Sequence, residues 1–95
     1  MLELIPQYMQ PGLIRWIIGG ELQGDFLMAY LTNDLFGALG CADSTNFENF
    51  TNYAMFLRNY APMDCYGNHA KVEVWRRAGG YKGIIAGTVR QVAEG

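Results

Sequence analysis

The sequence is short of charge and of long apolar runs. Only 17% of its 95 residues are charged, against about 25% in a typical soluble domain, while 51% are hydrophobic. A membrane-spanning helix needs about 18 consecutive apolar residues, and the apolar stretch at residues 13–18 is six residues long and interrupted by Arg15. No basic segment precedes it, as a secretory signal would require. We therefore expect one cytoplasmic domain, residues 1–95, with no membrane partner.

Basic residues are almost missing from the first part of the chain. Residues 1–57 hold six acids and one base, Arg15, whereas residues 58–95 hold six bases and three acids. A nucleic-acid-binding surface needs several clustered phosphate contacts, and the sequence has no run of four basic residues, which argues against direct nucleic-acid binding. The asymmetry indicates either an acidic face that meets a basic partner or charges that mix in the folded chain.

Cysteine and histidine are scarce as well. A zinc site needs three or four Cys, His or acidic ligands, so Cys41, Cys65 and His69 would have to converge with an Asp to form one. Cys65 and His69 are the one thiol–imidazole pair, and no third group is placed to orient them. Residues 79–83 are rich in glycine but lack the spacing and the hydroxyl of a phosphate-binding loop. We predict no catalytic residue, no metal and no cofactor, and hence a protein that is not an enzyme.

Glycine and proline divide the chain into periodic segments. These are residues 8–18, 25–39, 44–60 and 68–78. Thr45 and Glu48 match a capping box for the third segment, and Asn68 is a candidate N-cap for the fourth. The alternation at residues 71–75 also suits a strand. The sequence predicts a mainly α fold, a compact bundle of about four short helices. A small β-hairpin or terminal strand pair remains open, and residues 80–95 are a candidate for a loosely attached tail.

Asp34 is the most informative single residue. On a continuous helix over residues 25–39 it projects at about 80°, inside the apolar arc. A buried carboxylate must be paired or hydrogen-bonded. The pattern thus predicts a structural buried carboxylate that caps a neighbouring helix or pairs with Arg15 or Arg58. A polar contact in a ligand groove is the alternative.

Aromatic residues exceed what one small core can easily enclose, because the chain has two tryptophans, six tyrosines and five phenylalanines. The core is expected to contain Trp16, Phe26, Tyr30, Phe47, Phe50, Tyr53 and Leu57. The residues left to compete for the surface are Phe36, Met55, Phe56, Tyr66 and Tyr81. Exposed apolar patches often mark protein partners. The candidate partner-binding residues are Glu21, Asp25, Asp43, Glu48, Met55 and Asn59.

Several motifs resemble a group of small phage and prophage proteins of undefined function. They are Gly12-Leu13-Ile14-Arg15-Trp16-Ile17, Gly24-Asp25-Phe26-Leu27, Asn33-Asp34-Leu35, Ala42-Asp43, Asn46, Ala61-Pro62 and Cys65-Tyr66-Gly67. The resemblance extends from Pro6 to Gly80, and Asn33-Asp34-Leu35 is its most specific element. This chain departs from the group at two places: the group tends to have Trp where this chain has Tyr66, and Ser-Pro where it has Asn68-His69. The resemblance implies a mobile-element origin and a mostly helical fold, and it transfers no catalytic residue.

These observations lead to a functional hypothesis. We expect a phage-encoded accessory protein that acts in the host cytoplasm by binding and inhibiting a host protein or protein–RNA effector complex, as an anti-CRISPR or similar anti-defence inhibitor does. The alternatives are a self-assembling structural or regulatory protein, for which a homodimer is the simplest form, and a small-ligand binder.

Overall fold

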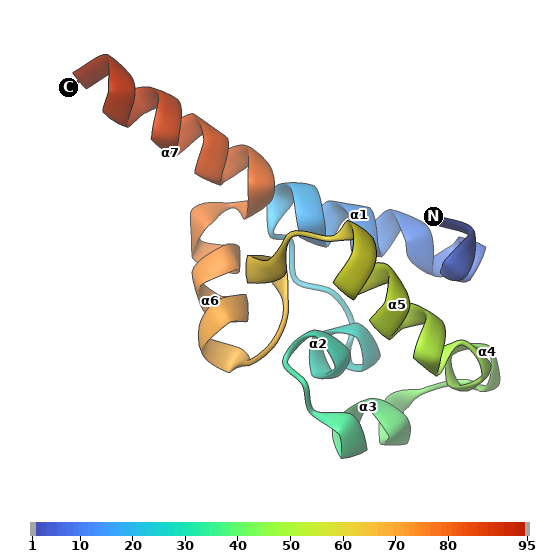
Figure 1. Ribbon diagram of the computed structural model, residues 1–95. Coiled ribbons are helices and arrows are strands. Elements are labelled where there is room, and N and C mark those ends of the chain that lie inside the picture. Colours follow the sequence, from blue (N-terminus) through green and yellow to red (C-terminus); the bar gives the residue numbers. More distant parts are fainter. Residues whose placement is uncertain (1, 95) are drawn as a thin grey trace.

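The computed structural model describes the backbone of residues 2–94 and the side chains of residues 2–87. This part of the chain is helical and contains no strand (Figure 1). The α-helices are α1 (Gln10–Gly19), α2 (Asp25–Leu31), α3 (Leu35–Cys41), α4 (Ser44–Glu48), α5 (Phe50–Tyr60), α6 (His69–Ala78) and α7 (Gly80–Glu94), and the 3-10 helices are η1 (Leu2–Leu4), η2 (Gln7–Met9) and η3 (Met63–Cys65). The mainly α fold is confirmed. The expected number of about four helices is wrong, and the described residues form neither a hairpin nor a terminal strand pair.

The boundaries of α1 follow from its proline and glycine. Pro11 lies in the first turn, where a missing N–H costs no hydrogen bond. Gly20 ends the helix at a φ of 66°, in the left-handed region that glycine adopts without steric strain. Leu13 and Trp16 are fully buried on one side, while Ile14 is exposed on the other. α1 therefore supplies one wall of the core.

The segment expected to form one helix over residues 25–39 is broken in the middle. The Thr32 hydroxyl donates to the Met28 carbonyl at 2.9 Å. Asn33 then takes a φ of 65°, a left-handed conformation that asparagine tolerates better than most residues. α3 begins after this break, and the Asp34 carboxylate caps it by accepting a hydrogen bond from the Gly37 N–H at 3.0 Å. The segment is therefore two short helices.

Asp34 is exposed, so the expectation of a buried carboxylate is wrong. Its angular position assumed a continuous helix, and the left-handed residue Asn33 resets the helical phase just before it. The carboxylate caps α3, the helix that begins at the next residue, rather than a separate neighbouring helix, and it pairs with neither Arg15 nor Arg58.

The segment expected over residues 44–60 is also two helices. Asp43 is the N-cap of α4, since its carboxylate accepts a hydrogen bond from the Asn46 N–H at 2.7 Å. The capping box at Thr45 and Glu48 is wrong because the helix begins before Thr45. α4 ends at Glu48, and Asn49 is both its C-cap and the N-cap of α5, which starts at Phe50.

This break changes which aromatic residues are buried. Phe47 is 63% exposed, although its spacing predicted a core position. Phe56, which was expected at the surface, is buried beside Tyr53 and Leu57 on α5. The periodicity of α5 therefore holds by itself and does not extend back through α4.

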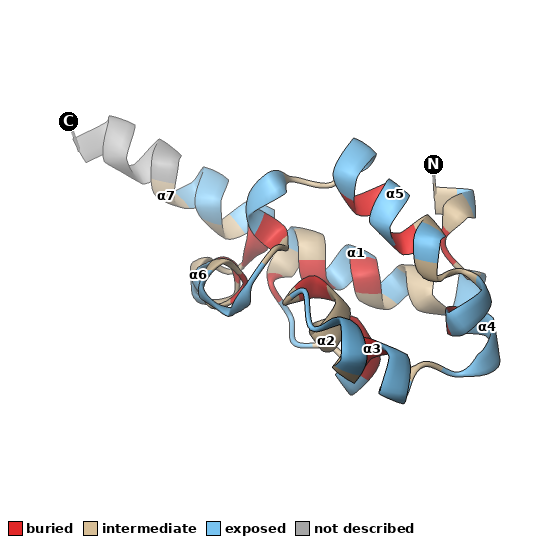
Figure 2. Cartoon of the chain, turned by 60° about the horizontal axis from the view of Figure 1, so that its bottom comes forward, coloured by how far each residue is buried: buried red, intermediate tan, exposed pale blue. Residues whose placement is uncertain are grey.

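Aromatic side chains close the core with three buried hydrogen bonds. Trp16 Nε1 donates to the Cys65 carbonyl at 2.9 Å, and Trp75 Nε1 donates to the Trp16 carbonyl at 3.1 Å. The Tyr53 hydroxyl donates to Asn46 Oδ1 at 2.6 Å. These bonds hold α1 against η3 and α6, and α4 against α5. The buried residues accordingly lie on the inward sides of the helices (Figure 2).

The fourth segment is a helix, as the capping residues predicted. Asn68 accepts a hydrogen bond from the Lys71 N–H at 2.9 Å, and Gly79 ends α6 at a φ of 82°. α7 then continues as a helix that contacts α1 and α6 and extends away from the body of the molecule (Figure 1). The loose attachment of residues 80–95 stays a prediction, and Gly95 lies outside the described residues.

Candidate functional site

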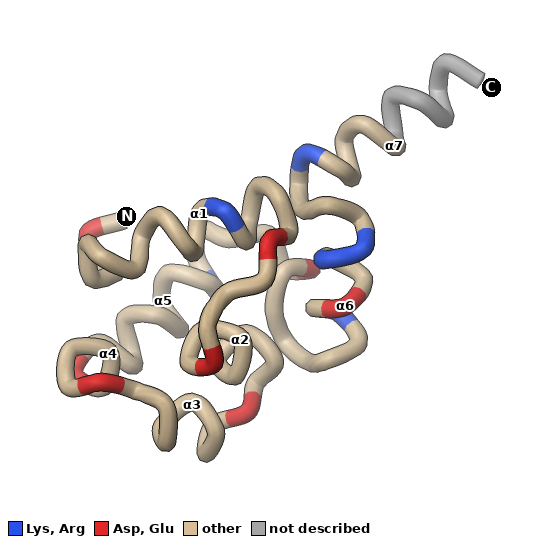
Figure 3. Tube along the Cα trace, turned by 180° about the vertical axis from the view of Figure 1, so that it is seen from behind, with Lys and Arg blue, Asp and Glu red and all other residues tan. Residues whose placement is uncertain are grey.

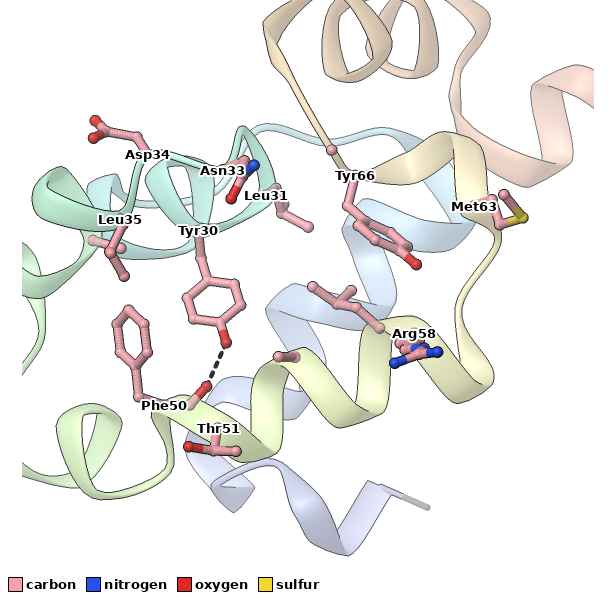
Figure 4. A pocket seen from close by; sticks show the side chains of 14 residues that line it. Tyr30, Leu31, Asn33, Asp34, Leu35, Phe50, Thr51, Arg58, Met63 and Tyr66 are labelled. Atoms are coloured by element: carbon pink, nitrogen blue, oxygen red, sulfur yellow. Dashed lines mark hydrogen bonds between the residues drawn. The ribbon is translucent and has the colours of Figure 1, made fainter.

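An open groove lies between α2, α3 and α5 and reaches the loop before α6 (Figure 4). Its volume is about 900 Å³. We call it the α3–α5 groove. Its walls are mainly apolar, and the large side chains that form them include Tyr30, Leu35, Phe50, Leu57, Met63 and Tyr66. Ligand-binding clefts have volumes of about 300–1,000 Å³, so this groove is large enough to hold several side chains of a partner.

Packed aromatic rings make one wall of the groove rigid. The rings of Tyr30 and Phe50 meet edge to face with centroids 4.8 Å apart. Behind them the rings of Phe26 and Tyr53 pack in the same manner at 5.3 Å. Such pairs each contribute about 0.5–1.5 kcal/mol beyond the burial of their area. The wall is therefore formed before any ligand arrives.

Tyr30 offers the groove an apolar ring rather than a reactive group. Its hydroxyl donates a hydrogen bond to the Phe50 carbonyl, the dashed line of Figure 4. Burial raises the pKa of the Tyr30 hydroxyl above its usual range. The hydroxyl is therefore neutral near pH 7, and its proton is already engaged.

The opposite wall is the loop that carries Tyr66. The Gly67 N–H donates to the Leu31 carbonyl at 2.8 Å, which ties this loop to the end of α2. The Lys71 ammonium lies 5.9 Å from the centroid of the Tyr66 ring, in cation–π range. The loop is thus anchored at two points, and the ring of Tyr66 faces the groove (Figure 4).

Two charged residues border the groove, and they differ in their partners. The Asp34 carboxylate caps α3 and points away from the rings of Tyr30 and Phe50 (Figure 4). Arg58 is exposed beside Tyr66, and it forms no hydrogen bond or ion pair with any described residue. Arg58 is therefore the one charged group of the described lining whose hydrogen-bond donors are all unused.

Large apolar side chains continue the groove onto the surface. Two residues of the groove lining are well exposed, Met63 at 73% and Leu35 at 52%, and Phe36, the next residue after Leu35 on α3, is 82% exposed. The predicted exposure of Phe36 and Met55 is confirmed. Single exposed apolar residues are normal in soluble proteins, but a patch that borders an apolar groove is typical of a partner-binding surface.

The six candidate partner-binding residues are all exposed, and none of them lines the α3–α5 groove. Glu21 lies in the loop between α1 and α2, Asp25 begins α2, and Asp43 caps α4. Glu48 ends α4, and Met55 and Asn59 lie on α5. The α5 residues that line the groove are Phe50, Thr51, Ala54, Leu57 and Arg58. Met55 and Asn59 lie about 40–80° round the helix from Thr51, on the side away from Leu57.

The structure does bring Asp25 and Asp43 together. Both line a separate depression of about 330 Å³, which Arg15 also borders. The Tyr8 hydroxyl donates to Asp43 Oδ2 at 2.6 Å, and this hydrogen bond holds the pKa of the Asp43 carboxyl below its usual range. Figure 3 shows acidic residues along the α1–α2 loop and near α3 and α4, and basic residues on α6 and α7. The charge asymmetry of the sequence is therefore also an asymmetry in space.

Cys65 and His69 are not arranged as a nucleophile and its base. Cys65 is fully buried, and burial raises the pKa of its thiol to about 12. A thiol with that pKa is almost entirely protonated at neutral pH and is a poor nucleophile. His69 is exposed at the start of α6, and both Cys65 and the exposed Cys41 are free thiols.

None of the helices in the described part of the chain has the length and hydropathy needed to cross a membrane.

No protein-family model matches this chain, and no curated protein and no solved structure is significantly similar to it. The resemblance to small phage proteins stays a prediction. The function is therefore inferred from the α3–α5 groove and the surface around it.

Proposed function

We propose that this protein acts by binding another protein and that the α3–α5 groove is its docking surface. The observation that carries this proposal is a preformed apolar groove of about 900 Å³ whose lining includes the exposed Leu35 and Met63. Fully buried aromatic and aliphatic anchors supply most of the affinity of protein interfaces. Covering this apolar surface removes it from water, which lowers the free energy of the complex and favours binding.

The finer proposal is a phage-encoded inhibitor of a host defence protein, of the anti-CRISPR kind. Its support is the resemblance to small phage proteins together with the exposed acids Glu21, Asp25 and Asp43. An acidic face speeds encounter with the basic surface of a nucleic-acid-binding effector and makes the association sensitive to salt. The inhibitor would act stoichiometrically, by occupying the effector.

The test compares groove and control variants in one assay. Cells with an active CRISPR system express the wild-type chain, the double variant Leu35→Ser with Met63→Ser, or Val74→Ser. Val74 is a matched control because it is 67% exposed on α6, outside the groove lining. We expect the wild type and Val74→Ser to raise the plating efficiency of a targeted phage and the double variant to raise it less. Equal plating with and without the wild-type chain would contradict the anti-CRISPR proposal.

A biochemical arm tests the general proposal of protein binding. Immobilised wild-type chain is exposed to host lysate at low and at high salt, beside the double variant. We expect a partner that the wild type retains at low salt, that high salt weakens, and that the double variant loses. A partner that binds all variants equally would show that the groove is not the docking surface.

Self-association is a second candidate function, favoured by a different surface. Ile14 and Ile18 on α1 and Ile85 on α7 are exposed, and these two helices contact each other. Light scattering over a range of protein concentrations tests this candidate. A mass that rises with concentration in the wild type and not in Ile18→Ser would favour it, and a constant monomer mass would exclude it.

A further inference from the structure

We infer that the segment occupying the α3–α5 groove is an amphipathic α-helix of the partner protein that carries an acidic residue opposite Arg58. This inference rests on the proposed function, since it describes what the docking surface selects. It follows from two properties of the groove: the helices α2, α3 and α5 supply most of its lining, and Arg58, its one charged residue without a partner among the described residues, is cationic.

The helical walls determine the backbone conformation of the partner segment. The mid-helix N–H and C=O groups of α2, α3 and α5 bond within their own helices, the Gly67 N–H of the opposite wall donates to the Leu31 carbonyl, and the described residues contain no strand edge. An extended segment would find few backbone partners and would bury unpaired N–H and C=O groups, each costing free energy. A helix satisfies its backbone internally and needs only apolar side chains on one face.

The shape and chemistry of the walls determine that face. Leu35 and Phe50 face each other from α3 and α5, and Tyr66 and Met63 continue the apolar lining toward the loop (Figure 4). A helix that lies in such a groove presents apolar residues spaced three and four apart. A volume of about 900 Å³ accommodates several such side chains.

Arg58 determines the charge of the partner segment. Its guanidinium has no hydrogen-bond or ion-pair partner among the described residues, whereas Asp34 already caps α3. A partner that covered Arg58 with apolar atoms would remove its water without replacing the hydrogen bonds, and a basic residue there would repel it. A carboxylate accepts two parallel hydrogen bonds from the guanidinium fork. The groove therefore favours an acidic residue at this position.

The experiment is a selection from displayed peptides of about 15 residues, or four helical turns, on immobilised wild-type chain. We expect enriched peptides with apolar residues spaced three and four apart and an Asp or Glu at a fixed offset. The best peptide is then synthesised with its acidic residue intact or changed to Lys. Fluorescence anisotropy should show about tenfold weaker binding of the Lys peptide to the wild type. Arg58→Glu should reverse that preference.

Arg15→Glu is the matched control. It changes the net charge of the protein by the same amount, but Arg15 borders the depression lined by Asp25 and Asp43 and not the α3–α5 groove. It should leave the preference for the acidic peptide unchanged. Circular dichroism of each variant checks that it is folded, and both substituted residues are exposed.

The outcomes separate this inference from the proposed function. Two results would overturn the inference and leave protein binding at the groove intact. One is the selection of groove-binding peptides that lack an acidic residue, and the other is an Arg58→Glu variant that still prefers the acidic peptide over the Lys peptide. If the Leu35→Ser, Met63→Ser variant weakened the binding of no selected peptide, the proposed docking surface itself would be overturned. A wild-type dimer that Arg58→Glu dissociates would identify the occupant as a second copy of this chain, which also overturns the inference.

Discussion

Gly20 and Gly80 lie so close that neither position has room for a side chain. A Cβ atom on Gly20 would lie 2.7 Å from the backbone nitrogen of Gly80, and one on Gly80 would lie 2.5 Å from the nitrogen of Gly20. Both residues also have positive φ, 66° and 72°. This contact joins the end of α1 to the junction of α6 and α7, and it allows Trp75 to reach the Trp16 carbonyl.

Replacing either glycine by alanine should strongly destabilise the protein. A left-handed conformation costs an L-residue about 1–2 kcal/mol, and the backbone clash adds to it, so we expect the free energy of unfolding to fall by at least about 2 kcal/mol. Gly40→Ala is the control, because nothing lies within 4 Å of a Cβ there and its φ is not positive. It should raise stability by up to about 1 kcal/mol. Urea unfolding of the three variants checks the signs, and a neutral Gly20→Ala would refute the close contact.

The buried hydrogen bond from Tyr53 to Asn46 should contribute more to the free energy of unfolding than the exposed one from Tyr8 to Asp43. Asn46 is 4% exposed, so Tyr53→Phe leaves its amide oxygen buried without a donor. We expect a loss of about 1–3 kcal/mol in the free energy of unfolding. Tyr8→Phe removes a hydroxyl that bonds Asp43 at the surface, and its effect should stay within about 0.5 kcal/mol. Equal effects in thermal or urea unfolding would contradict the buried location of the Asn46 amide.

Substitutions of Asp34 should report a helix cap rather than a binding residue. Asp34→Ala removes the acceptor of the Gly37 N–H and should cost about 1 kcal/mol of stability. Asp34→Asn keeps an acceptor oxygen and should cost much less. If Asp34→Asn instead leaves stability unchanged and abolishes partner capture, the carboxylate takes part in binding and its role as a cap is secondary.

The sequence determined the helical class and several of the helix boundaries. Pro11, Gly20, Asn68 and Gly79 act locally, through backbone conformations and caps that short sequence patterns reveal. The breaks at Asn33 and Asn49 were not predicted, because neither position carries the glycine or proline that marks a break. One left-handed residue is enough to change the face of every residue after it.

The α3–α5 groove was not predicted for a different reason. Tyr30, Phe50 and Leu57 have the spacing of core residues, and no periodic pattern distinguishes the floor of a groove from the middle of a core. The loop that carries Tyr66 is held beside the groove by residues distant in sequence: the Gly67 N–H donates to the Leu31 carbonyl, and the Cys65 carbonyl accepts a hydrogen bond from Trp16 Nε1, 49 residues away. The one available signal was the spacing of Thr51, Ala54 and Arg58, a weakly polar face on α5.

The pH dependence of stability should include a contribution from Glu73 at the acid end. Hydrogen bonds from Arg76, and then from Arg77, lower the pKa of the Glu73 carboxyl from 4.5 to about 2. Because its pKa is lower in the folded state, the stabilisation is complete above pH 4.5 and is lost as the pH falls toward 2. Glu73→Gln should therefore lose less stability than the wild type across this window, measured by urea midpoints at several pH values.

Glu48→Gln is the control, since the Glu48 carboxylate has no hydrogen bond or ion pair with the described residues. Parallel acid profiles for Glu73→Gln and the wild type would show that the Arg76 and Arg77 contacts do not persist in solution, as surface ion pairs often do not.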